Sequence, residues 1–126
     1  MEKIRLGLID DQNLFRQSLS TLLAGIPHYE VVMEEENGTS CLSTLKKMSI
    51  LPDIILLDME MPGMDGMEVN AALQKYYPEI KVIILSVYAK DRLITRMIES
   101  GASGYLVKNC GKKELCMAID EVFTKG

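Results

Sequence analysis

Short runs of β-branched and other apolar residues alternate with longer segments of helical spacing along the whole chain. The first run, 4–9, stops at two aspartates, and residues 14–23 then place apolar side chains three to four positions apart, which predicts one apolar stripe on a helix. The same pattern of a strand followed by a helix recurs to the end of the chain. Further strands are predicted at 31–33, 54–57, 82–85 and 105–107, and further helices at 41–48, 69–76, 93–98 and 115–123.

Five strand-then-helix units in 126 residues predict an α/β fold, in which helices cover both faces of a parallel sheet. The run Ile54-Ile55-Leu56-Leu57 is apolar throughout, as is typical of a strand buried on both sides. Gly101 follows the fourth helical segment and is expected to end it in the left-handed conformation. Because no linker or low-complexity segment interrupts the pattern, residues 1–126 are expected to form one domain, with no output domain in this chain.

The composition agrees with one globular domain and excludes several functional classes. Hydrophobic residues make up 48 % of the chain, and no run approaches the length of a membrane span. The first residues lack the apolar stretch of a secretory signal, so a cytoplasmic protein without a membrane partner is expected. The formal net charge of −4 argues against direct nucleic-acid binding by this chain.

The three cysteines indicate neither a disulfide framework nor a zinc site. There are three cysteines, Cys41, Cys110 and Cys116, which is an odd number, and their spacing matches no zinc-binding motif. The chain also contains only one histidine, His28. We expect reduced thiols, and we expect His28 to be a solvated loop residue.

Polar residues gather where the predicted strands end. Asp10 and Asp11 follow the first strand, Asp58 the third, Ser86 the fourth and Lys108 the fifth. In an open parallel sheet these carboxyl ends share one edge, and ligands bind there at the point where the strand order reverses. The fold is therefore expected to bring these residues together. Taken alone, the first two aspartates are equally compatible with capping the helix that follows them.

The chemistry of this predicted cluster follows from its charges. Three carboxylates within a few ångströms repel one another and require a cation or a bound proton. Mg²⁺ prefers such oxygen ligands and often bridges them to phosphate, and phosphoryl transfer requires mainly positioning and charge neutralisation. Lys108 offers a mobile positive charge and Ser86 a hydroxyl donor. Together they would surround a phosphoryl group carried covalently by Asp58.

Over its whole length the chain resembles the receiver domains of response regulators, the phosphoacceptor proteins of two-component signalling. Four motifs occur in the order and at the separations found in that family. They are the pair Asp10-Asp11, the segment from Pro52 to Gly66 around Asp58, the pair Leu85-Ser86, and the segment from Gly101 to Lys108. The resemblance implies a flavodoxin-like (βα)₅ fold with strand order 2-1-3-4-5.

The resemblance also assigns a role to each motif residue. Asp58 would be the phosphoacceptor. Mg²⁺ would be held by the side chains of Asp10, Asp11 and Asp58 and by the backbone carbonyl of Glu60. The phosphoryl donor would be a sensor histidine kinase or a phosphorelay protein. The domain would not be an enzyme in the usual sense, because it would catalyse only its own phosphorylation and dephosphorylation.

In the state implied for the phosphorylated domain, three residues respond to the new charge. Lys108 would contact the phosphoryl group, Ser86 would move toward it, and Tyr105 would change rotamer. Tyr105 is also expected to be partly core. The surface of the fourth helix, fifth strand and fifth helix would then change. That surface, or one formed by the first and fifth helices, would favour a homodimer or an output partner.

Several short segments resemble the subfamily whose members usually carry a LuxR-type DNA-binding domain after the receiver. This resemblance implies an output in transcription regulation. The segments are Leu14-Phe15-Arg16, Glu30-Val31-Val32, Asn37-Gly38 and Lys108-Asn109. One departure is Val87, where receivers usually have a smaller residue. A branched side chain there would narrow access to Asp58 and slow phosphotransfer or hydrolysis.

Three other classes share parts of this pattern. A phosphatase of the haloacid dehalogenase type requires a second aspartate two residues after its nucleophile, and that position is Glu60. A flavodoxin-like electron carrier requires a small, uncharged first loop, whereas Asp10 and Asp11 would repel a flavin phosphate. A receiver-like interaction module that is never phosphorylated remains an open alternative.

Overall fold

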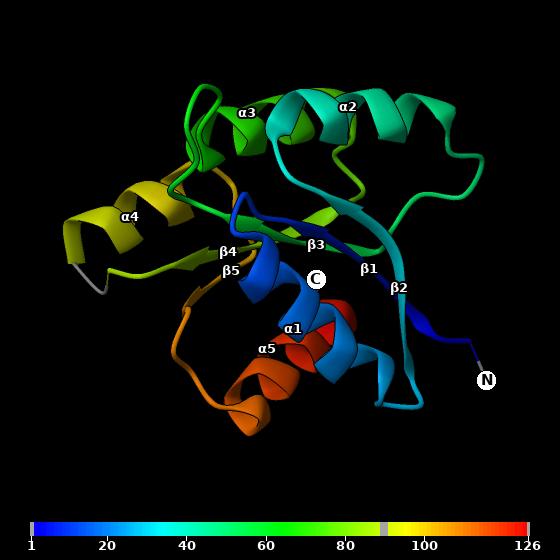
Figure 1. The fold of residues 1–126 in the computed structure, drawn as a ribbon. Coiled ribbons are helices and arrows are strands. Elements are labelled where there is room, and N and C mark those ends of the chain that lie inside the picture. The colour runs from blue at the N-terminus through cyan, green and yellow to red at the C-terminus, as the bar shows by residue number, and fades with distance from the viewer. Residues whose placement is uncertain (1, 89–90, 126) are drawn as a thin grey trace.

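One parallel sheet organises the computed structural model, which describes residues 2–88 and 91–125. Its strands lie in the order β2-β1-β3-β4-β5, and all four neighbouring pairs are parallel (Figure 1). The predicted strand order and flavodoxin-like fold are therefore confirmed. The strands are β1 (Ile4–Ile9), β2 (Tyr29–Glu35), β3 (Ile54–Asp58), β4 (Lys81–Ser86) and β5 (Gly104–Val107).

Helices cover both faces of the sheet, with α2 and α3 on one side and α1 and α5 on the other (Figure 1). The helices are α1 (Asn13–Ala24), α2 (Gly38–Lys47), α3 (Gly66–Tyr76), α4 (Asp91–Glu99) and α5 (Lys112–Lys125). Within the described residues, none of these helices combines the length and the apolar character that crossing a membrane requires.

Alternate residues of the central strands fill two separate cores. Ile55 of β3 belongs to the core beneath α2 and α3, to which α4 contributes Met97. Leu56, the next residue of β3, belongs to the core beneath α1 and α5. All five residues of β3 are buried, as its continuous apolar run predicted. Its last residue is Asp58, so the most enclosed strand carries a carboxylate to the sheet edge.

The edge strand β2 is longer than the sequence pattern predicted. The apolar pattern indicated 31–33, whereas backbone pairing with β1 extends the strand from Tyr29 to Glu35. Glu30 and Glu34 belong to it because an edge strand tolerates polar side chains that face solvent. Side-chain periodicity alone therefore underestimated this strand.

Two amide side chains of α3 form hydrogen bonds with the end of α4. Gly101 adopts φ +91° after α4, which confirms the predicted left-handed helix end. The Asn70 side chain on α3 is fully buried, and its Nδ2 donates to the Ser100 carbonyl at 3.2 Å and to Ser100 Oγ at 2.8 Å. Gln74 Nε2 donates to the Gly101 carbonyl at 3.1 Å. These bonds satisfy carbonyls that α4 leaves without helical partners.

The thiols are free, and His28 lies exposed in the loop before β2, as predicted. Cys41 is buried, whereas Cys110 and Cys116 are partly buried, and none of the three forms a disulfide. Burial raises the pKa of Cys41 to about 12, which keeps it a neutral thiol. The His28 side chain also makes a contact that the sequence did not predict, because its Nε2 lies 3.2 Å from Oδ1 of Asp120 on α5.

Gly66 allows the first turn of α3 to lie directly against the end of β3. A β-carbon at this position would lie 2.5 Å from the carbonyl oxygen of Asp58 and 2.6 Å from the α-carbon of Met59. Both are backbone atoms, so no side-chain rotation would relieve the contact. Asp65 and Glu68 complete a capping box around the same helix start.

Replacing Gly66 by alanine is expected to lower the free energy of unfolding by about 1–3 kcal/mol, because the backbone beneath Asp58 must shift. Gly111→Ala is the matched control, since a β-carbon there meets nothing within 4 Å. It is expected to change stability by less than about 0.5 kcal/mol. Urea denaturation measures both variants. An equal effect of the two substitutions would show that the close approach at Gly66 is not a constraint.

Candidate functional site

Three aspartates meet at the carboxyl edge of the sheet. Asp10 and Asp11 follow β1 and Asp58 ends β3, and these two strands are hydrogen-bonded neighbours. One carboxylate oxygen from each residue lies within 4.8 Å of the others. Asp10 is 3 % exposed and Asp58 1 % exposed. The structure thus brings together the three acids that the sequence predicted to be neighbours.

Backbone amides orient the two most buried carboxylates. The backbone N–H of Gln12 donates to Oδ1 of Asp10 at 2.8 Å, and the backbone N–H of Glu60 donates to Oδ1 of Asp58 at 3.2 Å. Each bond comes from two residues further along the chain, in the turn that leaves the strand. Such short-range bonds are characteristic of Asx turns, in which aspartate shapes the loop that follows it.

Lys108 supplies the positive charge of the cluster. Its Nζ lies 3.0 Å from Oδ2 of Asp10 and 3.1 Å from Oδ1 of Asp58, and it also donates to Oε1 of Gln12 at 2.8 Å. Only 8 % of the Lys108 side chain is exposed. Burial alone would lower the pKa of Lys108, but its hydrogen bonds and charge pairing with the two aspartates outweigh this and raise it. Lys108 is therefore held in its charged form.

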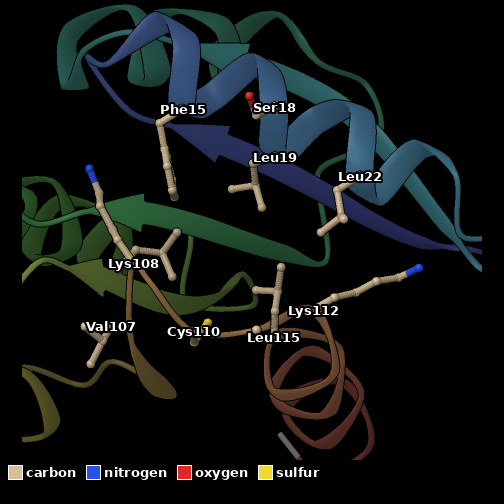
Figure 2. Close-up of a pocket in the computed structure, with 11 residues that line it drawn as sticks. Phe15, Ser18, Leu19, Leu22, Val107, Lys108, Cys110, Lys112 and Leu115 are labelled. Carbon is tan, nitrogen blue, oxygen red and sulfur yellow. The ribbon is translucent and has the colours of Figure 1, made fainter.

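An apolar surface beneath Lys108 helps to hold this ammonium in place. Its Nζ lies 4.8 Å from the centroid of the Phe15 ring on α1, within the range of a cation–π contact. A cavity of about 230 Å³ continues from this contact between α1 and α5, lined mainly by apolar side chains (Figure 2). Phe15, Leu19 and Leu22 extend into it from α1 and face Leu115 of α5. The ammonium thus meets the carboxylates on one side and this apolar surface on the other.

The carboxyl group of Asp58 is shifted strongly toward its protonated form. Burial, and then the negative charge of Asp10, raise its pKa to about 7, although Lys108 acts in the opposite direction. The neighbouring Asp11 carboxyl adds to the rise. One ammonium is therefore insufficient to compensate three carboxylates in this setting.

Two carboxylate oxygens at the centre of the cluster lack hydrogen-bond partners within the described part of the chain. They are Oδ1 of Asp11 and Oδ2 of Asp58, and both atoms are buried; a third buried oxygen, Oδ2 of Asp10, has the Lys108 ammonium 3.0 Å away. Buried polar atoms are normally paired, so unpaired carboxylate oxygens here are suited to a cation. The donor set consists of oxygen atoms alone, which fits a hard divalent cation such as Mg²⁺ rather than zinc.

A second group of contacts joins the loop after β3 to the end of β4. Ser86 is fully buried, and its hydroxyl donates to Oε2 of Glu60 at 2.7 Å. The backbone N–H of Val87 donates to Oε1 of Glu60 at 3.2 Å, and the backbone N–H of Tyr88 donates to the Ser86 hydroxyl at 3.1 Å. The Glu60 carboxylate thus bridges two adjacent donors. The sequence predicts a role for the backbone carbonyl of Glu60 but not these side-chain hydrogen bonds.

Tyr105 lies next to this loop. Its ring packs against the core beneath α2 and α3, as expected for a partly buried residue, and its hydroxyl donates to the Tyr88 carbonyl. Burial and then the nearby Glu60 charge raise the pKa of Tyr105, so its hydroxyl remains a donor. Tyr88 itself is half exposed.

The model of the response regulator receiver domain family matches residues 6–120, which include all four motifs and the edge on which they meet. The chain belongs to this family. The prediction made from the motifs is therefore confirmed.

Known relatives agree in sequence and in structure. This receiver domain is 36 % identical over 124 residues to the transcriptional regulatory protein DegU of Brevibacillus brevis, and 38 % identical over 120 residues to the response regulator GacA of Pseudomonas protegens. These alignments cover 98 % and 95 % of the chain but only 52 % and 55 % of the two relatives. The chain thus spans about half the length of the curated relatives it matches.

The fold is shared with solved receiver structures. The signal receiver domain of the response regulator NarL from Mycobacterium tuberculosis has a TM-score of 0.91 at 32 % identity, with full coverage of both chains. A LuxR-family DNA-binding response regulator from Staphylococcus aureus has a TM-score of 0.85 at 28 % identity, and the match covers 95 % of this chain and 98 % of that one. Both neighbours are response regulators, one of them of the LuxR family.

Metal-free receiver domain is expected to lose stability as pH rises from about 4 to 7. Because the folded pKa of Asp58 lies above its ordinary value, the folded state binds a proton that the unfolded chain has released in this window. Asp58→Asn is expected to remove this loss and to stabilise the protein at pH 7.5 by about 1–3 kcal/mol.

Urea denaturation in EDTA at pH 4.5 and 7.5 measures this effect. Glu79→Gln is the control, because it removes one negative charge at an exposed position just before β4 and outside the aspartate cluster. Added Mg²⁺ is expected to stabilise wild type more at pH 7.5 than at pH 4.5, since protons compete for the same oxygens. A stabilisation by Asp58→Asn that is equal at both pH values would contradict the assignment.

Proposed function

We propose that this receiver domain is a phosphoacceptor switch of a two-component system, with Asp58 as the acceptor. The observation that carries the proposal is the placement of a buried Asp58 carboxylate among Asp10, Asp11 and Lys108 at the carboxyl edge of the sheet. Membership of the receiver family supports the same reading. A strand that ends in a buried, poorly compensated carboxylate has no evident structural benefit.

The proposed donor is a phosphohistidine on a sensor kinase or a phosphorelay protein. A carboxylate oxygen of Asp58 attacks the phosphorus atom, the phosphorus–nitrogen bond breaks, and its electron pair remains on the departing imidazole. Asp58 must be ionised to attack, and Lys108 favours that form. Phosphoryl transfer depends mainly on positioning and charge neutralisation, which are the properties of this site. The domain itself catalyses the step, but no separate substrate is turned over.

The chain's own oxygens would hold a magnesium ion beside the acceptor. The ligands would be the side chains of Asp10, Asp11 and Asp58 and the backbone carbonyl of Glu60. When bound, Mg²⁺ neutralises negative charge on the carboxylates and on the phosphoryl oxygens. The two buried oxygens without hydrogen-bond partners support this assignment.

Phosphorylation would change the surface formed by α4, β5 and α5. Lys108 and the Ser86 hydroxyl would turn toward the phosphoryl oxygens, and Tyr105 would change rotamer as its neighbours move. The new surface would favour a homodimer or an output partner. Because relatives such as DegU are named as transcriptional regulators, the proposed output is control of transcription in the cytoplasm by a DNA-binding part outside this chain.

Two other classes fit the site less well. In a haloacid dehalogenase phosphatase, the residue two positions after the nucleophile would be an aspartate that exchanges protons with the substrate. Here it is Glu60, whose carboxylate accepts hydrogen bonds from Ser86 and Val87. In a flavodoxin-like carrier, this sheet edge would bind a flavin phosphate, and the buried Asp10 and Asp58 carboxylates would repel it.

Incubation with acetyl phosphate and Mg²⁺ is expected to add the mass of one phosphoryl group to wild type. Intact-mass spectrometry should show no addition to Asp58→Asn or in the presence of EDTA. Asp53→Asn is a matched control, since Asp53 lies just before the opposite end of β3 and pairs with Arg5. It should be phosphorylated normally. If wild type gains no mass and binds no beryllofluoride, the domain is an unphosphorylated interaction module.

Val87→Ala is expected to shorten the lifetime of the aspartyl phosphate severalfold, because a smaller side chain would open the approach to Asp58. Val87 follows the buried Ser86 directly, and its own side chain is 52 % exposed, so the substitution should cost little stability. The decay of the phosphorylated mass measures this lifetime. Val122→Ala on α5 is the control, and an unchanged lifetime in Val87→Ala would remove the access hypothesis.

A further inference from the structure

The Glu60 side chain engages the two donors that a phosphoryl group on Asp58 would need. Its Oε2 accepts from the Ser86 hydroxyl at 2.7 Å and its Oε1 from the Val87 backbone N–H at 3.2 Å. These donors are consecutive along the chain at the carboxyl end of β4, and β4 pairs directly with β3, where Leu85 lies opposite Asp58. A carboxylate that bridges two such donors presents the same acceptor pattern as two oxygens of a phosphoryl group.

Resting on the proposed phosphoacceptor function, we propose that Glu60 is a positioning residue that acts as an internal phosphoryl mimic. Its carboxylate holds Ser86 and Val87 in the unphosphorylated state, and both donors must leave Glu60 before they reach a phosphoryl group on Asp58. Glu60 therefore sets how readily the domain enters its phosphorylated conformation.

The competition is exclusive because each donor has one proton. The Ser86 hydroxyl donates its proton to Glu60, while its oxygen accepts from the backbone N–H of Tyr88. The backbone N–H of Val87 is likewise a single donor. Because Ser86 is fully buried, its hydroxyl can exchange one protein acceptor for another, but it cannot form a hydrogen bond with bulk water instead.

Charge makes the two states incompatible as well. We call the two hydrogen bonds from Ser86 and Val87 to the Glu60 carboxylate the clamp. The backbone N–H of Glu60 donates to Oδ1 of Asp58 at 3.2 Å, so the clamp is attached to the acceptor residue itself. A phosphoryl group on Asp58 adds one to two negative charges at this position. Repulsion from that charge disfavours the Glu60 carboxylate in its present place, while the new oxygens attract Ser86 and Val87.

Breaking the clamp would also affect the surface formed by α4, β5 and α5. Tyr88, which donates to Ser86, also offers its carbonyl to the Tyr105 hydroxyl. A shift of Ser86 and Val87 displaces this carbonyl and removes the bond that fixes Tyr105 in its present rotamer. Glu60, Ser86, Tyr88 and Tyr105 thus form a continuous chain of hydrogen bonds from the loop after β3 to β5.

Two variants separate the clamp from a general charge effect. Glu60→Ala removes both hydrogen bonds and the charge but keeps the backbone carbonyl. Glu60→Asp keeps the charge but is shorter by one methylene, so it does not reach both donors. Both variants are expected to bind beryllofluoride, in saturating Mg²⁺, roughly three- to tenfold more tightly than wild type. Glu79→Ala, at an exposed remote position, should bind like wild type.

The second readout requires neither a phosphoryl mimic nor a metal. Amide exchange of Val87, followed by ¹H–¹⁵N NMR in EDTA, is expected to be protected in wild type and faster in Glu60→Ala and Glu60→Asp. Two results would overturn the clamp and leave the phosphoacceptor function intact. One is that wild type binds beryllofluoride and Glu60→Ala binds it no more tightly. The other is that the amide exchange rate of Val87 is the same in wild type and in the variants. If no variant binds beryllofluoride, wild type included, the proposed function fails and the competition fails with it.

Discussion

The site depends on the burial of negative charge at one edge of a parallel sheet. Strand order places β1 beside β3, so the acids that follow these strands share a small volume even though the strands lie far apart in the sequence. Coulombic repulsion grows as water is excluded, and Lys108 compensates only part of it. The raised pKa of Asp58 and the unpaired carboxylate oxygens are two consequences of the same imbalance. Both are features that the proposed phosphoacceptor function would use, since a bound cation would compensate the remaining negative charge.

The rest of the fold keeps that imbalance from relaxing. β3 is buried along its whole length, so Asp58 cannot turn into solvent without disturbing both cores. Gly66 brings α3 against the backbone of Asp58, and backbone amides orient the carboxylates. Packing energy from strands and helices thus maintains an electrostatic arrangement that is unfavourable by itself, as expected where function rather than stability determines the residues.

Sequence reasoning predicted the architecture and the cluster because both follow from periodicity and topology. Once alternating strands and helices imply a parallel sheet, residues such as Asp58 and Lys108 at the strand ends must meet. It did not predict the side-chain bonds of Glu60 or Asn70, because these depend on rotamers and on which donor lies within reach. It also underestimated β2, whose polar residues belong to the strand through backbone pairing alone. The sequence pattern did not predict the His28–Asp120 contact either, because the two residues lie 92 positions apart and meet only in the folded structure.

Hydrogen bonds at this edge explain why the domain would act as a switch rather than respond gradually. The Ser86 hydroxyl and the Val87 backbone N–H each offer one hydrogen, and Glu60 and a phosphoryl group on Asp58 would compete for these two donors. Intermediate arrangements would leave a buried donor unpaired, which costs more free energy than either fully bonded state. Because Tyr88 and Tyr105 belong to the same chain of hydrogen bonds, a change of bonding beside Asp58 would be transmitted to β5. Under the proposed function, two discrete bonding patterns at one site would therefore become two discrete surfaces at another, as a two-state signalling domain requires.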